Sequence, residues 1–445
     1  MYRKIICYVV FTLVQVMLVF GKMYKKEQES KKRIKKYAFR PYKFETIETF
    51  HGCKMMNLLY PQPRSGHRIG ADSSNFYCIG GFNPMMAPEM VDMEQDYWLQ
   101  RAFPLFQEMW RFNFASRTWH RYYNNATLPE EAVSNALVLQ GNLLMVYGGT
   151  GSPFGFKCSN QLHVCNIRDE LPRMMKIKTS GDLPPPMYGQ AIIYHNDYLY
   201  TIGGTTGTSY TCDIHRLNLC TYEWTEVYSS RESRGRLVGR RDEPTGRYRH
   251  EVAFDGDNIF VFGGGTQWLT FELENVPTFS LTKQRWTTNR TIGDRRYGWP
   301  EPRKYHGANL ITLNGLKQVF ITGGTDGEQI FKDLWRLDLK TFEWTYFAKF
   351  QMPRELYFHA TSTTPDGKLY IFGGILSDTD NNHLRTDMIC STWLCIPKLS
   401  EICWDAILFY QPYIVLRDPK ELRNAGLPKS YVDRIPPNRC EDFIG

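Results

Sequence analysis

Residues 244–264 read PTGRYRHEVAFDGDNIFVFGG, and this stretch decides the fold because its pattern recurs along the chain. Two short apolar segments flank a turn, and the second of them ends in a pair of glycines. Six segments of the chain end in this way, and the second glycines of successive pairs lie 68, 55, 60, 60 and 50 residues apart. A four-stranded blade with its turns needs about this much chain. The pairs are Gly80–Gly81, Gly148–Gly149, Gly203–Gly204, Gly263–Gly264, Gly323–Gly324 and Gly373–Gly374.

Two further motifs surround the glycine pairs. A segment with Pro and Arg precedes His67, His250, His306 and His359, whereas the second and third copies deviate, with PEEAVS at 129–134 and PMYG at 186–189. Downstream, a Trp follows a His or another Trp by nine residues, as in Trp110/Trp119, His215/Trp224 and Trp335/Trp344. Glycine pairs permit positive φ where a blade crowds its neighbour, and the Trp supplies apolar surface for packing between blades.

Six copies of this combination resemble the kelch repeat over residues 60–397. The resemblance implies an all-β fold, a six-bladed kelch β-propeller with a short C-terminal helical appendix. The chain departs from the repeat at Pro172, where no Trp follows His163, and in a long insertion at residues 82–105. We expect five segments: a hydrophobic leader (1–22), a basic linker (23–55), the propeller (56–396), a helical box (397–435) and a flexible tail (436–445).

The net charge of +8 does not indicate a nucleic-acid-binding surface. Residues 22–43 contain ten Lys or Arg and two Glu, so this pre-domain segment alone accounts for the excess. The 11 Cys are an odd number without a CxxC pair, which favours buried free thiols over a zinc site or a disulfide framework. We therefore expect no metal, no cofactor and no nucleic-acid partner.

The apolar run at residues 5–20 has three possible interpretations, which predict different cellular locations. It is compatible with a signal peptide ending near residue 21, with a retained anchor that gives membrane contact, or with translation that starts at Met23. Eight basic residues follow the run, and the positive-inside rule would keep the following domain in the cytoplasm. We expect a cytoplasmic protein with Asn125 and Asn289 unglycosylated, and the secretory pathway is the alternative.

After the sixth copy, residues 397–410 show a helical pattern. Leu399, Cys403 and Ile407 recur every four residues, with Ile402 beside them. This face either packs on the propeller as a cap or docks into a partner's groove. It resembles the elongin-binding box, although Lys398 replaces the small residue usual before the Leu. Leu427, Pro428 and Tyr431 are similar to the short segment by which such receptors bind a cullin-2 scaffold.

Together these motifs resemble the kelch-propeller substrate receptors of cullin-RING ubiquitin ligases, which bind elongin B/C. The resemblance implies a non-catalytic adaptor whose propeller binds substrate proteins with a C-terminal glycine. Arginine is the natural partner of a carboxylate because its guanidinium binds both oxygens. Aromatic walls could come from Phe154, Tyr210, Tyr248 and Trp268. The candidate arginines are Arg64, Arg247, Arg249, Arg303 and Arg354.

Two other classes of function remain open from the sequence. Some kelch-type propellers are metal-dependent enzymes, but the His residues here stand at repeat positions, one per blade, and indicate architecture instead of a clustered metal site. A secreted or cytoskeletal interaction scaffold without a ligase role is the second alternative. The leader favours its secreted form, and the C-terminal helical motifs argue against it.

Overall fold

The computed structural model describes residues 36–49, 60–85, 105–122, 128–169, 171–230, 242–378 and 382–436. They form two compact units. One consists of Pro41–Phe112 and Arg117–Ile396, and the other contains the described residues of Met1–Arg40, Asn113–Ser116 and Pro397–Gly445. The predicted leader, the sequon at Asn125 and nearly all of the predicted tail lie outside the described residues.

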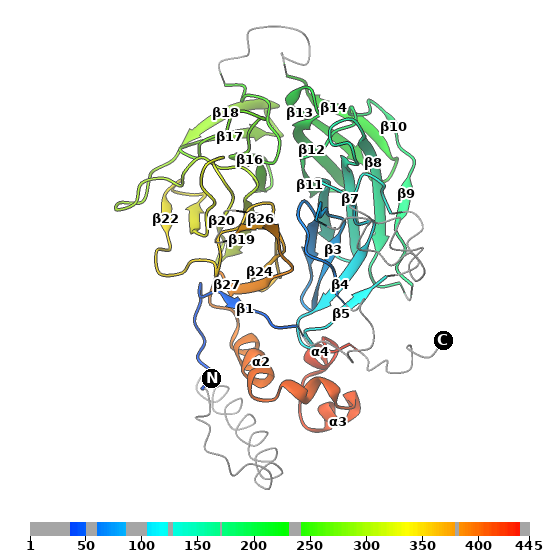
Figure 1. Cartoon of the computed structure of the whole chain (residues 1–445), viewed down its shortest axis with the longest axis vertical. Helices are drawn as coiled ribbons and strands as arrows, with labels where there is room; N and C mark the ends of the chain where they lie inside the picture. Colours follow the sequence, from blue (N-terminus) through cyan, green and yellow to red (C-terminus); the bar gives the residue numbers. More distant parts are fainter. Residues whose placement is uncertain are drawn as a thin grey trace. The chain divides into compact units, whose positions relative to one another are not determined.

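The larger unit is a six-bladed β-propeller, as the repeat predicted, and Figure 1 shows its sheets following one another around a ring. Each blade is a mainly antiparallel sheet whose first strand contacts the first strands of both neighbouring blades. The first blade consists of β2 (Arg68–Ala71), β3 (Asn75–Ile79), β4 (Met109–Asn113) and β5 (Trp119–Arg121). The second consists of β6 (Ala136–Gln140), β7 (Leu143–Thr150), β8 (Cys158–Asn166) and β9 (Met175–Ile177). The third consists of β11 (Ala191–His195), β12 (Tyr198–Thr205), β13 (Tyr210–Asn218) and β14 (Glu223–Tyr228), and the short strand β10 (Ser180–Gly181) pairs parallel to β14.

The last three blades repeat this arrangement, and a small hairpin follows the glycine pair of the sixth. The fourth and fifth blades are β15 (Glu251–Phe254), β16 (Asn258–Phe262), β17 (Asn275–Ser280) and β18 (Arg285–Arg290), then β19 (Gly307–Leu313), β20 (Leu316–Thr322), β21 (Leu334–Asp338) and β22 (Trp344–Tyr346). The sixth consists of β23 (Ala360–Thr363), β24 (Lys368–Phe372), β27 (Ile389–Trp393) and β1 (Glu45–Thr46), and its hairpin is β25 (Ile375–Ser377) with β26 (His383–Arg385).

The sixth blade is completed by a strand from the N-terminal side of the chain. β1 pairs antiparallel with β27, and the Tyr42 amide donates to the Trp393 carbonyl at 2.7 Å. The Tyr42 ring lies 4.5 Å from that of Phe347. Residues 41–47 were assigned to the basic linker on composition, which does not register a two-residue strand, and the structure places them in the propeller.

The glycine pairs lie where each blade meets the next. A Cβ added at Gly203 would approach the His250 ring of the following blade to 2.8 Å, and one at Gly204 would approach Gln190 of its own blade to 3.0 Å. Gly373 likewise lies against His67 and joins the sixth blade to the first. Only residues without a side chain allow both approaches, and the φ of 61° at Gly203 suits glycine as well.

Tryptophans fill the layers between blades, as expected from their spacing. Trp335 and Trp344 share a buried cluster with Phe260 and Phe262 of the fourth blade. Trp224 is 1% exposed and packs against Tyr147 of the second blade. Burying a large aromatic side chain contributes about 1.5–3 kcal/mol, so these layers are a main source of the propeller's stability.

The smaller unit is helical. Its elements are α2 (Leu399–Tyr410), the 3-10 helix η2 (Pro412–Leu416), α3 (Pro419–Asn424) and α4 (Lys429–Val432). Asp418 caps α3 by accepting from two backbone amides, and Pro419 suits its first turn because it lacks an amide hydrogen. The core of this unit contains Ala115, Trp404, Ile414, Val415, Leu422, Leu427, Val432 and Ile435. No helix among the described residues has the length and apolarity needed to span a bilayer.

Candidate carboxylate site on the propeller axis

One residue from each blade contributes to a closed ring of backbone hydrogen bonds. Each has a φ between 52° and 71° and stands immediately before the residue that occupies the repeat His position. The amide of each donates to the carbonyl of the residue in the preceding blade, at 2.7–3.4 Å, until the circle closes. The six residues are Gly66, Ser134, Gly189, Arg249, Tyr305 and Phe358. Because the six bonds encircle the propeller, this ring surrounds its axis.

Arg249 is the charged member of this ring, and its side chain is 4% exposed. One Nη2 hydrogen bond reaches the Ser134 Oγ, two blades away, and the guanidinium lies 4.7 Å from the centre of the Phe358 ring. Gly66 provides room, because a Cβ there would lie 3.3 Å from Nη2. The Arg249 Nε is buried without a hydrogen-bond partner. Burial lowers the pKa of Arg249 to about 9, so the side chain is still cationic at neutral pH.

A salt bridge joins two blades across the axis, at the position that follows the repeat His. Arg68 of β2 and Glu251 of β15 belong to the first and fourth blades, on opposite sides of the ring, and they meet at 2.7 Å. The corresponding residues of the other four blades are small and leave space for this pair: Ala136, Ala191, Gly307 and Ala360. Glu251 forms a salt bridge with Arg68, whereas Arg249 forms none with a carboxylate of the described residues, so these two cations share one nearby anion. The axis therefore carries one uncompensated positive charge.

Tyrosines surround the guanidinium. The centre of the Tyr248 ring lies 5.5 Å from that of Tyr210, 6.0 Å from that of Tyr188 and 5.9 Å from that of Tyr305. The hydroxyls of Tyr248 and Tyr305 are hydrogen bonded to each other. Burial raises the pKa of Tyr248 and of Tyr305, so both phenols are protonated; one O–H donates to the other phenol, and the second O–H can donate to an anion. Tyr357 lies 6.2 Å from Tyr305 and extends the aromatic wall.

Two further cations lie in the loops around this wall. Lys304 donates from Nζ to the Thr266 carbonyl at 3.0 Å, and Arg385 donates from Nε to the Ser65 Oγ at 3.3 Å. Burial lowers the pKa of both side chains, which indicates a site that water only partly screens. An axial guanidinium, protonated phenols and flanking cations are groups that stabilise a carboxylate.

Three of the predicted arginines have another role. Arg64, Arg247 and Arg303 are buried, and each donates from Nη1 to the carbonyl of the first glycine in its own blade's pair, at 2.9–3.0 Å. Arg64 also pairs with Glu108, and Arg303 binds both oxygens of Asp333. These donors tie each blade's entry loop to its glycine pair, so the three arginines have an architectural role.

Arg354 does not share this architectural role. It is exposed and donates to the Ser377 carbonyl at 3.3 Å. The buried position equivalent to Arg64, Arg247 and Arg303 is occupied in the sixth blade by Leu356, which is 0% exposed. Arg354 stands two residues before the position that Arg64, Arg247 and Arg303 occupy in their repeats. Of the predicted aromatic residues, Tyr210 and Tyr248 lie in the wall, and Trp268 is 85% exposed on a neighbouring loop.

Most residues of the ring were not predicted from the sequence, and neither were Arg68, Glu251, Lys304 and Arg385. A signal was present in the repeat alignment, at the position before the His. It holds Gly, Ser, Gly, Arg, Tyr and Phe in the six blades, whereas the His position itself varies only between His, Asn and Gln. A position that faces the axis is free to differ between blades, because it does not pack between them.

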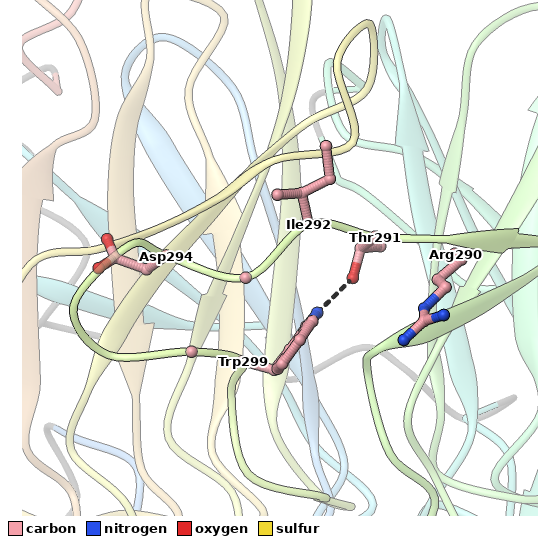
Figure 2. A pocket seen from close by; sticks show the side chains of 7 residues that line it. Arg290, Thr291, Ile292, Asp294 and Trp299 are labelled. Carbon is pink, nitrogen blue, oxygen red and sulfur yellow. Dashed lines mark hydrogen bonds between the residues drawn. The ribbon is translucent and has the colours of Figure 1, made fainter.

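A surface hollow of about 460 Å³ lies elsewhere, in the segment that follows the outer strand β18 (Figure 2). Arg290, Ile292 and Asp294 line it, and the Trp299 Nε1 donates to the Thr291 Oγ1 at 3.1 Å across it. Arg290 is paired with Glu274. This hollow contains no unpaired buried charge, and within the described residues no group of three or more His, Cys, Asp or Glu is arranged to hold a metal ion.

The helical unit presents part of the predicted docking face. Glu401 and Trp404 point into its core, where Glu401 binds Arg434 at 2.7 Å. Leu399 is 52% exposed, and Ile402, Cys403 and Ile407 are half-buried. In the predicted cullin segment, Pro428 is exposed, but Leu427 is buried in the core and the Tyr431 hydroxyl donates to Glu401 at 2.8 Å.

Comparisons with known proteins agree with this architecture. A family model described as the KLHDC2/KLHL20/DRC7 Kelch-repeats domain matches residues 5–204 and 231–403, and a Kelch motif model matches residues 186–227. The chain is 39% identical over 440 residues to the Kelch domain-containing protein 10 homolog of Drosophila melanogaster, which covers 95% of this chain and 70% of that protein. It is 37% identical over 375 residues to Kelch domain-containing protein 10 of Homo sapiens, which covers 84% and 80% respectively.

Proposed function

The chain belongs to the kelch-propeller family of Kelch domain-containing protein 10, and on that premise we propose that it is the substrate-recognition subunit of a cullin-2-type RING E3 ubiquitin ligase. A kelch propeller is typically a non-catalytic scaffold for protein interaction. In this proposal the propeller binds protein C-termini that end in glycine, and the helical unit binds elongin B/C and the cullin. The setting is the cytoplasm, where these partners act.

The observation that carries the proposal is the uncompensated charge of Arg249 on the axis. A buried cation without a counter-ion is costly, so a ligand that brings a negative charge to Arg249 would be stabilised there. A peptide carboxylate fits this requirement because it accepts from the guanidinium and from whichever of the Tyr248 and Tyr305 hydroxyls does not donate to the other. It also matches the flanking charges of Lys304 and Arg385.

The crowding around Arg249 supports a terminal glycine. The guanidinium lies beside Phe358, whose ring stacks on Tyr305 with centroids 3.8 Å apart, and Tyr305 in turn contacts Tyr248 through its ring and hydroxyl. A carboxylate must pass these rings to reach the buried Nε and Nη groups. A terminal residue without a side chain passes them with the least displacement, whereas a bulky residue would have to move an aromatic ring.

The surface of α2 supports the docking half of the proposal. The helix makes its core contacts through Glu401, Trp404, Ile407 and Leu408, which leaves Leu399, Ile402 and Cys403 partly open to solvent. Burial raises the pKa of the Cys403 thiol, so it is neutral and suited to an apolar groove. Phe409, Tyr410, Tyr413 and Leu416 are also at least 39% exposed and extend the apolar surface. Pro428 would be the accessible member of the cullin segment.

Peptide binding tests the propeller half. A fluorescent dodecapeptide of Ser and Ala ending in Gly is titrated with the full-length chain, beside the same peptide with an amidated C-terminus and one ending in Asp. We expect the amide to bind at least about tenfold more weakly, because a charged hydrogen bond contributes roughly 1.5–3 kcal/mol. Equal affinity for free acid and amide would exclude carboxylate binding.

Co-purification tests the ligase half. The intact chain should retain elongin B and C, and the double variant Leu399→Asp/Cys403→Asp should not, because two charges would enter an apolar groove. Lys420→Asp, at an exposed position of α3 outside this apolar surface, is the matched control for a negative charge elsewhere on this unit. Retention of elongin by the double variant at wild-type levels would identify α2 as a structural cap instead.

A further inference from the structure

A second recognition element lies on the loops that enclose the axial site. The loop of residues 265–270 begins at Gly265, which is bridged to Tyr248, and its Gln267 amide donates to the Tyr210 hydroxyl at 2.8 Å. The loop is therefore attached directly to the tyrosine wall around Arg249. At its tip, the Trp268 side chain is 85% exposed. The loop backbone is fixed, since the Thr266 Oγ1 accepts from the amides of residues 268 and 269.

The loop of residues 325–330 in the fifth blade lies next to it. The Thr270 Oγ1 donates to the Asp326 carbonyl at 2.8 Å, and Lys304 pairs with Thr325 while its Nζ donates to Thr266. The Asp326 carboxylate accepts from two amides of its own loop, which shapes the turn. Glu328 follows on the exposed side of that turn. An exposed indole and an exposed carboxylate thus belong to two loops that are hydrogen bonded to each other.

From this arrangement we infer that the rim formed by Trp268 and Glu328 binds a basic side chain, preferably Arg, a few residues upstream of the substrate's C-terminus. The inference rests on the proposed function and specifies its substrates further. An indole face attracts a guanidinium, which stacks on it, and a neighbouring carboxylate adds a charge of the complementary sign. The ligand is then dipolar: its terminal carboxylate meets Arg249 on the axis, and its cation meets the acidic rim.

The distance between Trp268 and Arg249 determines which residue of the ligand would reach the rim. Trp268 is three residues beyond Gly265, which pairs with the neighbour of Arg249. Adjacent paired segments lie about 5 Å apart and an extended chain rises about 3.3 Å per residue, so the tip is roughly 10–15 Å from the backbone of Arg249. An extended peptide covers that distance in about three to five residues. The corresponding loops of the second and third blades lack this pair of features: Lys157 offsets Glu130, and residues 206–209 are Thr, Gly, Thr and Ser.

The test is a charge scan with the full-length chain. Fluorescent dodecapeptides ending in Gly carry Gln, Arg or Glu at one position, three to six residues before the terminus, in an otherwise neutral sequence. At one of these positions we expect Arg to bind about five- to tenfold more tightly than Gln, from a cation–π contact and an exposed ion pair together. Raising the salt concentration should reduce this gain because the ion pair is solvent-exposed.

Variants assign the gain to residues. Trp268→Leu and Glu328→Gln should each remove most of the preference for Arg, and Glu328→Lys should reverse it toward Glu. Phe156→Leu, at an aromatic residue that is 90% exposed on another loop, and Glu301→Gln, at another exposed acid, should leave it unchanged. Equal affinity of Arg and Gln peptides at every position, with free acid still preferred over amide, overturns this inference alone. Loss of the preference for free acid would overturn the carboxylate site as well.

Discussion

Arg247 and Arg249 stand two residues apart on the same loop, both are buried, and they have different tasks. Arg247 donates to the Gly263 carbonyl of its own blade, as Arg64 and Arg303 do in theirs. Arg249 points across the axis to Ser134, and the other blades have no arginine at its position. The difference teaches that positions repeated between blades hold the propeller together, whereas a position that varies between blades is available for a ligand.

The His position illustrates the repeated kind. Its residue packs against the glycine pairs on both of its sides: His250 contacts Gly203 and Gly264, and Gln190 contacts Gly148 and Gly204 in the same way. Asn135 and Gln190 replace His in the second and third blades without breaking the ring. Packing accepts three polar side chains of similar shape here, and so no metal or proton-transfer role is needed to explain the periodic histidines.

The largest expected effect comes from breaking a repeated contact. Arg303→Met leaves the Asp333 carboxylate, now without its bidentate partner, in a mostly buried site. Removal of one member of a buried ion pair costs about 3–5 kcal/mol, so the thermal midpoint of the propeller should fall by several degrees in scanning calorimetry. The double variant Arg303→Met/Asp333→Leu should recover much of the loss. A single variant that unfolds at the wild-type temperature would contradict this role.

A smaller effect of a different kind is expected at the axis. Arg249→Met removes a buried charge that has no counter-ion, so stability should be unchanged or higher. Affinity for a Gly-ended free-acid peptide should fall by roughly 1.5–3 kcal/mol, measured by fluorescence polarisation. Arg247→Met is the matched control: it should lower the thermal midpoint and leave the affinity of the folded protein intact. A peptide that binds Arg249→Met normally would remove Arg249 from the site.

The glycine pairs and tryptophans were sufficient to predict the six blades, because each is required by a contact that every blade repeats. The site was predicted less well, for three physical reasons. Arg247 and Arg249 look alike in sequence, and the φ of 52° at Arg249, which turns its side chain away from the blade contact and toward the axis, cannot be read from the sequence. The Arg68–Glu251 pair joins opposite blades, 183 residues apart. β1 is two residues long, too short to show a strand pattern.

The His position yields a prediction about pH. Burial, helped by the neighbouring Arg247, lowers the pKa of His250 to about 3, so the folded protein keeps it neutral. Below about pH 6.5 the unfolded chain protonates this His and the folded protein does not, so stability falls as the pH falls. His250→Gln should weaken that dependence by up to about 1.4 kcal/mol per pH unit between pH 6.5 and 4, seen in thermal midpoints. An unchanged slope would show that His250 titrates in the folded state.

The smallest effect is expected at Arg354, which the repeat alignment had grouped with the buried arginines. Its side chain is exposed and makes one long hydrogen bond, to the Ser377 carbonyl, so Arg354→Ala should change stability by less than about 0.5 kcal/mol. Peptide affinity should not change, because Arg354 does not contact the ring around Arg249. Leu356→Ala, two residues away, is the matched control and should cost about 2–5 kcal/mol, since Leu356 fills the buried position that arginine occupies in three other blades. If Arg354→Ala destabilised the propeller as much as Leu356→Ala, the register of the sixth blade's entry loop would have to shift by two residues, and Arg354 would join the repeated arginines after all.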